Sequence, residues 1–416
     1  MNRPTSLLLA AVLLTGFSRA EDWPAFRGPH QDGHSEAKGL PIEWSPEKNI
    51  VWKADLPGKA WSSPVVAEGR IYLTNAVAIS NEENLHDTRT LRVLALEEKT
   101  GKILWDKEVF SISDPAATGV HQKNSFASPT PIFENGRIYA HFGHLGTACL
   151  DTQGRIIWKT QELSYHPQHG NGGCPAIVDD LLIFNCDAAD HPFIAALDKN
   201  SGKVRWQVPR ETDAQKTFSF STPAVIEVDA KEQVISAGSN LVQGLNPEDG
   251  SELWKVRYDG YSVIPQPIYG HGLIYMATGF NRASALAIKP GHGDITDTNV
   301  VWKVDKHAPL TPSLLLSGDD LFMVADNGMV SCLEAETGKV IWEERVAGPC
   351  SASPLLAEGR IYIQDENGVG YVIKASRNFE PLARNDLKEK SLASYAVTGN
   401  RLLIRTQKAL YCVGNP

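Results

Sequence analysis

Apolar and polar residues alternate along this chain in short runs that are separated by turns. Residues 332–342 read CLEAETGKVIW: an apolar segment, an acidic residue, a Gly-centred turn and a second segment that ends in Trp342. Such alternation around a tight turn predicts a strand, a hairpin and a returning strand. Related strings end at Trp105, Trp158, Trp206 and Trp254, and a longer version ends at Trp302.

The tryptophans also give the length of the repeat. Counted from Trp52, the successive intervals to Trp105, Trp158, Trp206, Trp254, Trp302 and Trp342 are 53, 53, 48, 48, 48 and 40 residues. A unit of this size holds four strands and their turns, as in a propeller blade, and it is too long for helical or leucine-rich repeats.

A second repeated string precedes these hairpins and supplies two further strands. It reads SSPVVAEGRIYL from Ser62 and SPLLAEGRIYI from Ser353. Proline suits the first residue of a strand because it has no N–H to donate to the ladder. Eight such strand starts occur, the last at Ser394 with Tyr395 in the proline position. The sequence therefore predicts an all-β, eight-bladed β-propeller over residues 49–416.

Both ends of the repeat region are incomplete. The segment Asn49 to Leu56 has the pattern of a fourth strand but lacks three strands before it, whereas Ser394 to Val413 supplies three strands and no fourth. If the strand near Trp52 completes the last blade, the ring has no open edge. We therefore expect the N-terminal strand to close the propeller.

The chain begins with features of an export signal. Residues 1–20 contain Arg3, an apolar stretch over 7–17 and the small-residue cleavage site Ser18-Arg19-Ala20, which together predict a signal peptide. A membrane anchor would need about 18 apolar residues, and no cysteine follows the cleavage site to carry a lipid. We expect a periplasmic or secreted monomer without an integral membrane segment, in which an N-terminal extension, residues 21–48, packs on the ring.

Charge and cysteines narrow the picture further. A net charge of -9 argues against binding of nucleic acid or anionic membranes. Cys149, Cys332 and Cys412 fall at a repeat position that small residues occupy elsewhere, so they are expected to be buried packing groups. No regular even spacing indicates a disulfide framework, although Cys174 and Cys186 on neighbouring predicted strands could pair.

The loops fall into two classes. In a four-stranded up-and-down blade, the second-to-third and fourth-to-first connections share one end of the ring, here called the long-loop end. At the opposite end the turns are short and uniform, such as Lys99-Thr100-Gly101. The long-loop connections vary in length and chemistry, and variable loops on a rigid scaffold commonly carry function. Ligand binding is therefore predicted at the long-loop end.

The candidate binding residues are Trp61, His121, Asn124, His144, His169, Asn171, Tyr261, Arg282 and Asp326. Each has a plainer interpretation. Histidine pairs need further ligands to hold a metal, so no metal site is assigned. Asn171 and Asp326 lie in ordinary turn sequences, and Trp61, Tyr261 and Arg282 could pack across blades. No H-E-x-x-H, G-x-S-x-G, C-x-x-C or phosphate-binding motif occurs.

The motif A-x-D-x-x-T-G-x-x-x-W resembles the tryptophan docking motif of pyrroloquinoline-quinone-type propellers, in which the indole packs between successive blades. The matching positions are Trp105, Trp158, Trp206, Trp254 and Trp342, with Trp52 and Trp302 as looser members. The opening WPAFRGP, residues 23–29, also resembles that of secreted bacterial repeat proteins of this type.

This resemblance implies two classes of function. Quinoprotein alcohol dehydrogenases hold the quinone with calcium, a vicinal cysteine pair and a catalytic aspartate, and this chain has no adjacent cysteines. The outer-membrane β-barrel assembly lipoprotein shares the repeat and serves as a scaffold for protein partners. We therefore expect a propeller that binds a protein partner or small polar ligand, with no cofactor assigned. The alternative is a quinone-dependent or metal-assisted enzyme, motivated by His121, His144, His166 and His169 approaching one mouth.

Overall fold

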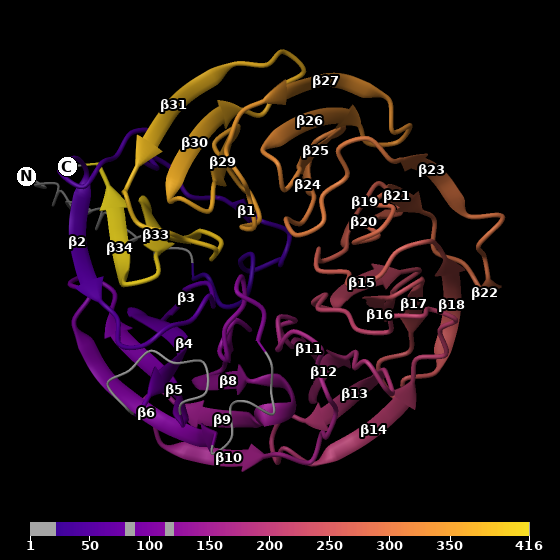
Figure 1. Cartoon of the computed structure of the whole chain (residues 1–416), viewed down its shortest axis with the longest axis horizontal. Helices are drawn as coiled ribbons and strands as arrows, with labels where there is room; N and C mark the ends of the chain where they lie inside the picture. The colour runs from indigo at the N-terminus through magenta and orange to yellow at the C-terminus, as the bar shows by residue number, and fades with distance from the viewer. Residues whose placement is uncertain (1–21, 80–87, 113–119, 416) are drawn as a thin grey trace, which may run out of the picture.

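Eight antiparallel sheets surround a central axis in the computed structural model, which describes residues 22–79, 88–112 and 120–415 (Figure 1). The predicted all-β propeller is confirmed. The first three blades consist of β3 (Val65–Ala67), β4 (Arg70–Ala78), β5 (Arg89–Glu97) and β6 (Ile103–Ile112); β7 (Ile132–Glu134), β8 (Arg137–His141), β9 (Thr147–Asp151) and β10 (Ile156–Thr160); and β11 (Ala176–Val178), β12 (Leu181–Cys186), β13 (Phe193–Asp198) and β14 (Val204–Pro209). A 3-10 turn, η2 (Gly143–Leu145), joins β8 to β9.

The fourth to sixth blades consist of β15 (Ala224–Val228), β16 (Lys231–Gly238), β17 (Leu241–Leu245) and β18 (Glu252–Arg257); β19 (Ile268–Gly270), β20 (Leu273–Ala277), β21 (Ala285–Ile288) and β23 (Val300–Val304); and β24 (Leu315–Ser317), β25 (Asp320–Val324), β26 (Met329–Glu334) and β27 (Val340–Arg345). The last two consist of β28 (Leu355–Ala357), β29 (Arg360–Gln364), β30 (Val369–Lys374) and β31 (Pro381–Asp386); and β32 (Ala396–Thr398), β33 (Arg401–Arg405), β34 (Ala409–Gly414) and β2 (Ile50–Asp55).

The eighth blade joins the two ends of the chain. Strand β2 pairs antiparallel with β34, and Trp52 lies opposite Cys412 in the register. Figure 1 shows β2 in indigo beside β34 in yellow. The expected closure by the N-terminal strand is confirmed. Because the last blade needs residues from both ends, the ring is complete only when the whole repeat region has folded.

The inner strands are buried and the outer strands are only half covered. Strand β12 has five buried residues out of six, whereas β14 alternates exposed and intermediate positions. Each blade packs between two neighbours, so both faces of its inner strands are apolar, and the outermost strand meets solvent along one edge. This explains why the inner strands read as nearly continuous apolar runs.

The indoles connect successive blades through a hydrogen bond and a glycine. Within the described residues, six of the seven predicted docking tryptophans donate the indole N–H to a backbone carbonyl of the next blade at 2.7–3.1 Å: Trp52 to Glu98, Trp105 to Thr152, Trp158 to Lys199, Trp206 to Pro247, Trp302 to Ala335 and Trp342 to Ser376. Gly202 has a φ of 73°, and a Cβ there would lie 2.4 Å from the Trp158 ring. The glycine therefore forms the turn and leaves room for the indole.

Trp254 departs from this pattern. Its indole N–H donates to the side chain of Gln233 in its own blade at 2.8 Å, and the ring covers Gly244, where a Cβ would lie 2.2 Å away. The hydrogen bond of this indole therefore stays within its own blade, although Trp254 shares a buried apolar cluster with Ile274 and Met276 of the next blade. An insert replaces the tight turn after β21, and its strand β22 (Gly293–Asp294) pairs in parallel with β18 of the preceding blade. Backbone pairing between β18 and β22 thus takes the place of an indole hydrogen bond between these two blades.

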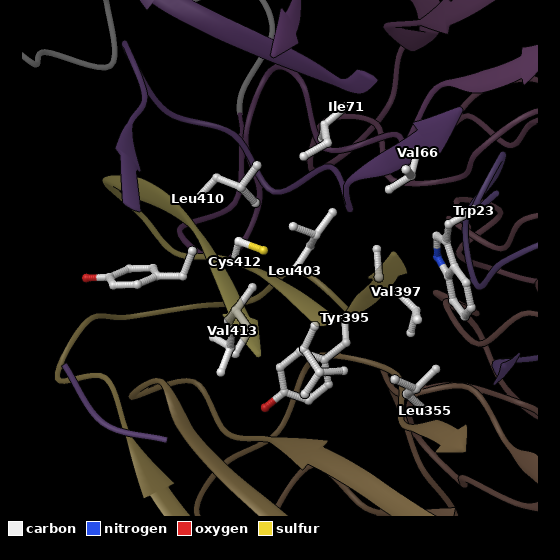
Figure 2. Packing of buried hydrophobic residues seen from close by; sticks show 14 of the residues in the cluster. Trp23, Val66, Ile71, Leu355, Tyr395, Val397, Leu403, Leu410, Cys412 and Val413 are labelled. Carbon is white, nitrogen blue, oxygen red and sulfur yellow. The ribbon is translucent and has the colours of Figure 1, made fainter. Parts of the chain in front are cut away.

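The N-terminal extension crosses the axis of the ring. Trp23 exchanges two backbone hydrogen bonds of 2.8 Å with Val66 of the first blade, and β1 (His34–Ser35) pairs in parallel with β28 of the seventh. Figure 2 shows Trp23 at the edge of the apolar cluster that includes Val66 and Leu355. These contacts lie near the ends of the first strands that face the short turns. The extension therefore covers the axis on that side.

The extension also supplies an indole where the seventh blade has none. Strand β31 contains no tryptophan, and Trp44 packs instead against Gly370 of the seventh blade, where a Cβ would lie 2.4 Å from its ring. The same indole makes an edge-to-face contact with Tyr395, which precedes the first strand of the eighth blade. Asn385 of β31 accepts the Trp44 backbone N–H at 2.8 Å.

The six cysteines all lie among the described residues, and each is buried with a free thiol. Cys149, Cys332 and Cys412 stand directly opposite Trp158, Trp342 and Trp52 in their sheets. A small side chain is needed there because the indole covers it. Cys174 and Cys186 are not joined. The predicted signal peptide lies outside the described residues, and none of the helical segments described could span a lipid bilayer.

A matched pair of substitutions tests the contact between the turn glycines and the indoles that cover them. Gly202→Ala and Gly136→Ala place alanine at nearly the same positive φ, but a Cβ at 136 meets no atom within 4 Å. Backbone strain should cost each variant about 1–2 kcal/mol of unfolding free energy. Gly202→Ala should lose about 1–3 kcal/mol more because Trp158 must move. Urea unfolding measures both, and equal losses would show that the indole seat contributes nothing.

Candidate functional site

A ring of small polar residues ties the blades together around the axis. They lie two residues before the first strands, and six of the eight donate the backbone N–H to the side chain of the equivalent residue in the next blade. The bonds are Ser63 to Thr130 (2.9 Å), Thr130 to Cys174 (3.2 Å), Cys174 to Thr222 (3.0 Å), Gln266 to Ser313 (3.0 Å), Ser313 to Ser353 (3.0 Å) and Ser353 to Ser394 (2.9 Å). The inner edges of the blades are thus held in register.

Above this ring, toward the long loops, lies a central cavity of about 590 Å³. The ring residues form part of its lining, and Phe26 of the N-terminal extension also lines it. Six of the nine predicted site residues lie in its wall: Trp61, His121, Asn124, His169, Tyr261 and Asp326. The volume and the mixture of aromatic and hydroxyl groups are typical of a ligand-binding cavity.

One side of the cavity is aromatic. His121 and His169 meet edge to face with ring centroids 5.5 Å apart, and His169 contacts Phe218 at 5.2 Å. Phe218 contacts Tyr261 at 5.8 Å, and Tyr261 contacts Phe280 at 6.4 Å. We call the four residues Phe218, Phe220, Tyr261 and Phe280 the aromatic wall. The contacts of His169 with His121 and Phe218, and that of Phe218 with Tyr261, are edge to face, an arrangement that is favourable beyond the area that it buries.

The two histidines are held by their loops. Asn124 donates its side-chain amide to the His169 carbonyl at 3.0 Å, and the His121 N–H donates to the same oxygen at 3.2 Å. Partial burial lowers the pKa of His169, and the nearby His121 and Lys216 lower it further. The imidazole of His169 is therefore neutral near pH 7 and adds an aromatic surface to the cavity.

The opposite side of the cavity is polar, but its carboxylate is already hydrogen-bonded within the protein. Both carboxylate oxygens of Asp326 accept hydrogen bonds: one from the N–H groups of Leu310 and Thr311, the other from the Thr311 hydroxyl at 2.6 Å. Asp326 therefore shapes the loop before β24. The interpretation of Asp326 as a turn residue and its position in the cavity wall are therefore compatible.

A salt bridge connects the two sides at the long-loop end. Lys123 of the second blade's loop lies 2.6 Å from Glu366 of the seventh, which also accepts the Ser351 hydroxyl at 2.7 Å. Burial opposes ionisation of Glu366, but the bonds from Lys123 and Ser351 outweigh it and hold its pKa below the ordinary value. The pair therefore stays ionised at neutral pH.

His144 and Asn171 are not part of the cavity lining. The Asn171 amide donates to the Phe142 carbonyl at 3.1 Å and contacts His144 Nδ1 at 3.0 Å, while its oxygen accepts the Tyr165 hydroxyl. Burial lowers the pKa of His144 to about 4. These two residues join the η2 turn to the loop before β11. The expected approach of His144 to a common mouth with His121 and His169 is not what the structure shows.

Arg282 also lies outside the cavity lining. Its side chain is largely exposed and stands 3.5 Å from the exposed Asp259. Ion pairs of this kind contribute little because water screens both charges.

The donor set does not fit calcium-bound quinone. Calcium takes six to eight oxygen ligands, several of them carboxylates. Among the described residues that line the cavity, Asp326 is the one that is acidic, and both of its oxygens already accept hydrogen bonds from the loop before β24. Across the described residues, no three histidine, cysteine or acidic side chains gather closely enough to hold a metal ion. Adjacent cysteines are likewise missing from the sequence.

Sequence reasoning missed Lys216 and three members of the aromatic wall, Phe218, Phe220 and Phe280. A signal was present in residues 216–222, KTFSFST, where aromatic and small polar residues alternate before a first strand. That alternation places both phenylalanines on one side of the loop. The convergence with Phe280 of the next blade requires knowledge of how the loops meet.

Buried neutral histidines should make the protein sensitive to acid. The folded-state pKa values of His144 (about 4) and His141 (about 3) lie below the ordinary 6.5, so the unfolded chain binds more protons. Stability should therefore fall as the pH is lowered from about 6.5 toward 4. His144→Gln should reduce proton uptake on unfolding near pH 5 by about one. Urea unfolding across this pH range gives the slopes, and identical slopes would contradict the burial of a neutral His144.

Comparison with known proteins agrees with this architecture. The family model described as outer membrane protein assembly factor BamB matches residues 36–173, 89–261, 190–294 and 292–408. BamB of Bordetella pertussis is 22% identical over 366 residues, 84% of each chain. BamB of Yersinia pestis is 26% identical over 208 residues, 44% of this chain and 49% of its own.

Solved structures share the fold. The crystal structure of BamB from Moraxella catarrhalis covers 82% of this chain and 97% of its own, with a TM-score of 0.55 and 17% identity. The computationally designed Ika8 protein covers 88% of this chain and all of its own, with a TM-score of 0.60 and 11% identity. The resemblance to quinone-type propellers and to the outer-membrane assembly protein is confirmed at the level of family and fold. Because the family model matches most of its length, this chain belongs to the family of outer membrane protein assembly factor BamB.

Proposed function

We propose that this protein is an exported scaffold that holds a protein partner at the long-loop end of its propeller. The observation that carries the proposal is the central cavity, which is bordered by the long loops and lined on one side by aromatic rings. Aromatic residues are enriched at the cores of protein interfaces. The related proteins named above are called outer membrane protein assembly factors, and assembly of other proteins requires contact with them.

The two ends of the ring differ in what they offer a partner. At the short-turn end, the connections are tight glycine turns, and the N-terminal extension crosses the axis. At the long-loop end, exposed side chains such as His121, Lys216 and Phe280 border the cavity. Rigid blades with varied loops provide a preformed binding surface, which lowers the entropic cost of association.

The polar groups at the cavity favour binding over catalysis, because they are already hydrogen-bonded or paired within the protein. Asp326 and Glu366 are occupied by hydrogen bonds and a salt bridge within the loops, and His169 holds its position through backbone contacts. These groups shape the cavity and keep its loops in place. A small polar ligand at the same face is the second kind of occupant that this geometry accommodates. The predicted signal peptide supports a location outside the cytoplasm.

Site-directed crosslinking tests which end binds the partner. All six native thiols are buried, so a cysteine introduced at an exposed position is labelled selectively. Gln122→Cys lies in a long loop and Lys99→Cys in a short turn, and both positions are exposed. A photoreactive label at 122 should crosslink a protein in the cell envelope, whereas the label at 99 should not.

Each labelled variant is compared with the unlabelled protein by urea unfolding, so that a loss of folding is recognised. Equal crosslinking at the two positions, or crosslinking at position 99 alone, would contradict the assignment of the partner to the long-loop end. Crosslinking at neither position in a well-folded protein would contradict the scaffold function itself.

A further inference from the structure

The aromatic wall is held in place by the backbone of its own loops. Tyr261 and Phe280 exchange two backbone hydrogen bonds of 3.3 and 2.8 Å, and the Ser262 N–H donates to the Phe218 carbonyl at 3.1 Å. Ser262 has a φ of 55°, which is unfavourable for a residue with a side chain. Strained conformations of this kind persist where the surrounding structure fixes them, and they cluster at functional sites.

Buried hydroxyls reinforce the same loops. The Ser239 hydroxyl donates to the Phe218 carbonyl at 2.9 Å and lies 3.1 Å from the Ser219 hydroxyl, which accepts the Val263 N–H at 3.1 Å. The loops of the fourth and fifth blades are therefore joined beneath the rings. An apolar group that enters the cavity meets a surface that is already formed, so little ordering cost remains.

Lys216 gives this surface a positive charge. Its ammonium nitrogen lies 4.4 Å from the Tyr261 ring centroid and 3.3 Å from the hydroxyl. Among the described residues, Lys216 has no salt-bridge partner within 4 Å, and the contacts of its ammonium group are those with Tyr261. Tyr261 and Lys216 also line a neighbouring groove that contains Asp213 and Asp259. Each of these aspartates stands near an arginine, Asp213 at 3.9 Å from Arg257 and Asp259 at 3.5 Å from Arg282.

Two further acidic groups of the described chain, Asp326 in the cavity wall and Glu366 beside it, are also engaged. Asp326 accepts three hydrogen bonds from its own loop, and Glu366 is paired with Lys123. Lys216 is thus a cation beside the aromatic wall whose charge is not balanced by a carboxylate of the described chain at contact distance. An incoming carboxylate would find a partner there, and an incoming ammonium or guanidinium group would be repelled.

We infer that the partner presents an aromatic side chain beside an acidic residue, with the ring on the aromatic wall and the carboxylate at Lys216. This inference rests on the proposed scaffold function and specifies its recognition element. An apolar cavity of about 150 Å³ is enough to hold a benzene ring. A cavity of about 590 Å³ therefore has room for one aromatic side chain together with the backbone and side chain of its neighbour.

Isothermal titration with short blocked peptides tests the inference. The reference peptide carries one Phe-Asp pair in a glycine and serine background, and companion peptides carry Phe-Asn, Phe-Lys or Ser-Asp. The Phe-Asp peptide should bind, and the Ser-Asp peptide should lose measurable binding. Phe-Asn should bind about threefold more weakly than Phe-Asp, as expected for a partly exposed ion pair. The difference should shrink at high salt.

Variants assign the effect to the two groups. Lys216→Gln should weaken Phe-Asp binding about threefold and leave Phe-Asn binding unchanged, which is the signature of direct coupling in a double-mutant cycle. Phe280→Ala should weaken both peptides, and its partly exposed position makes folding tolerant of the change. Lys306→Gln serves as the control, because Lys306 is an exposed lysine of a long-loop connection outside the cavity lining.

Three results would overturn the inference: equal binding of Phe-Asp and Phe-Lys, equal losses in the Lys216 and Lys306 variants, or binding of free phenylpropionate as tight as that of the peptide. The last result would indicate a small aromatic acid instead of a protein segment. If position 122 crosslinks a partner while no peptide binds, the recognition element alone is wrong. If neither occurs, the proposed scaffold function fails as well.

Discussion

The structure depends on closing a ring of blades that cannot bury their inner strands alone. Both faces of these strands are apolar, so each blade needs a neighbour on either side, and the first and last blades must meet. Trp52 makes that last contact by donating its indole N–H to Glu98 and covering Gly101, where a Cβ would lie 2.4 Å from the ring. A glycine at positive φ is needed both for the turn and for the space. One local motif therefore links the turn, the packing and the closure.

Where this motif is interrupted, other segments take over the contact. The insert after β21 takes the place of the tight turn found in the other blades, and its strand β22 pairs with β18 of the preceding blade. The seventh blade lacks a docking tryptophan, and Trp44 of the N-terminal extension fills the gap beside Tyr395. The extension then crosses the axis and contributes Phe26 to the cavity. The extension that supplies the missing indole thus also limits access to the axis from the short-turn side.

The fold could be predicted because its determinants are local and repeated. The spacing of Trp105 and Trp158 and the incomplete segments around Trp52 and Tyr395 are visible in the sequence without knowledge of distant contacts. The site was only partly predictable. His121 and His169 meet as expected, but His144 turns to Asn171 because the η2 turn and its hydrogen bonds fix its direction. Lys216 and Phe280 come together through bonds between loops of different blades, which strand periodicity does not encode.

Within the cavity, the groups that hold the loops in place differ from the groups that are left to contact a ligand. Asp326 and Glu366 accept hydrogen bonds from the loops on one side, so their charges are used to hold the cavity open. On the other side, the loops are held by backbone and hydroxyl bonds, which leaves the ring faces of Phe218 and Tyr261 for contact. Lys216 needs no carboxylate for its own position, because the Tyr261 ring supports it. The shape of this surface is fixed by groups that do not face the ligand. Its ligand-facing side chains can therefore vary without loss of the fold, as a scaffold for a specific partner requires.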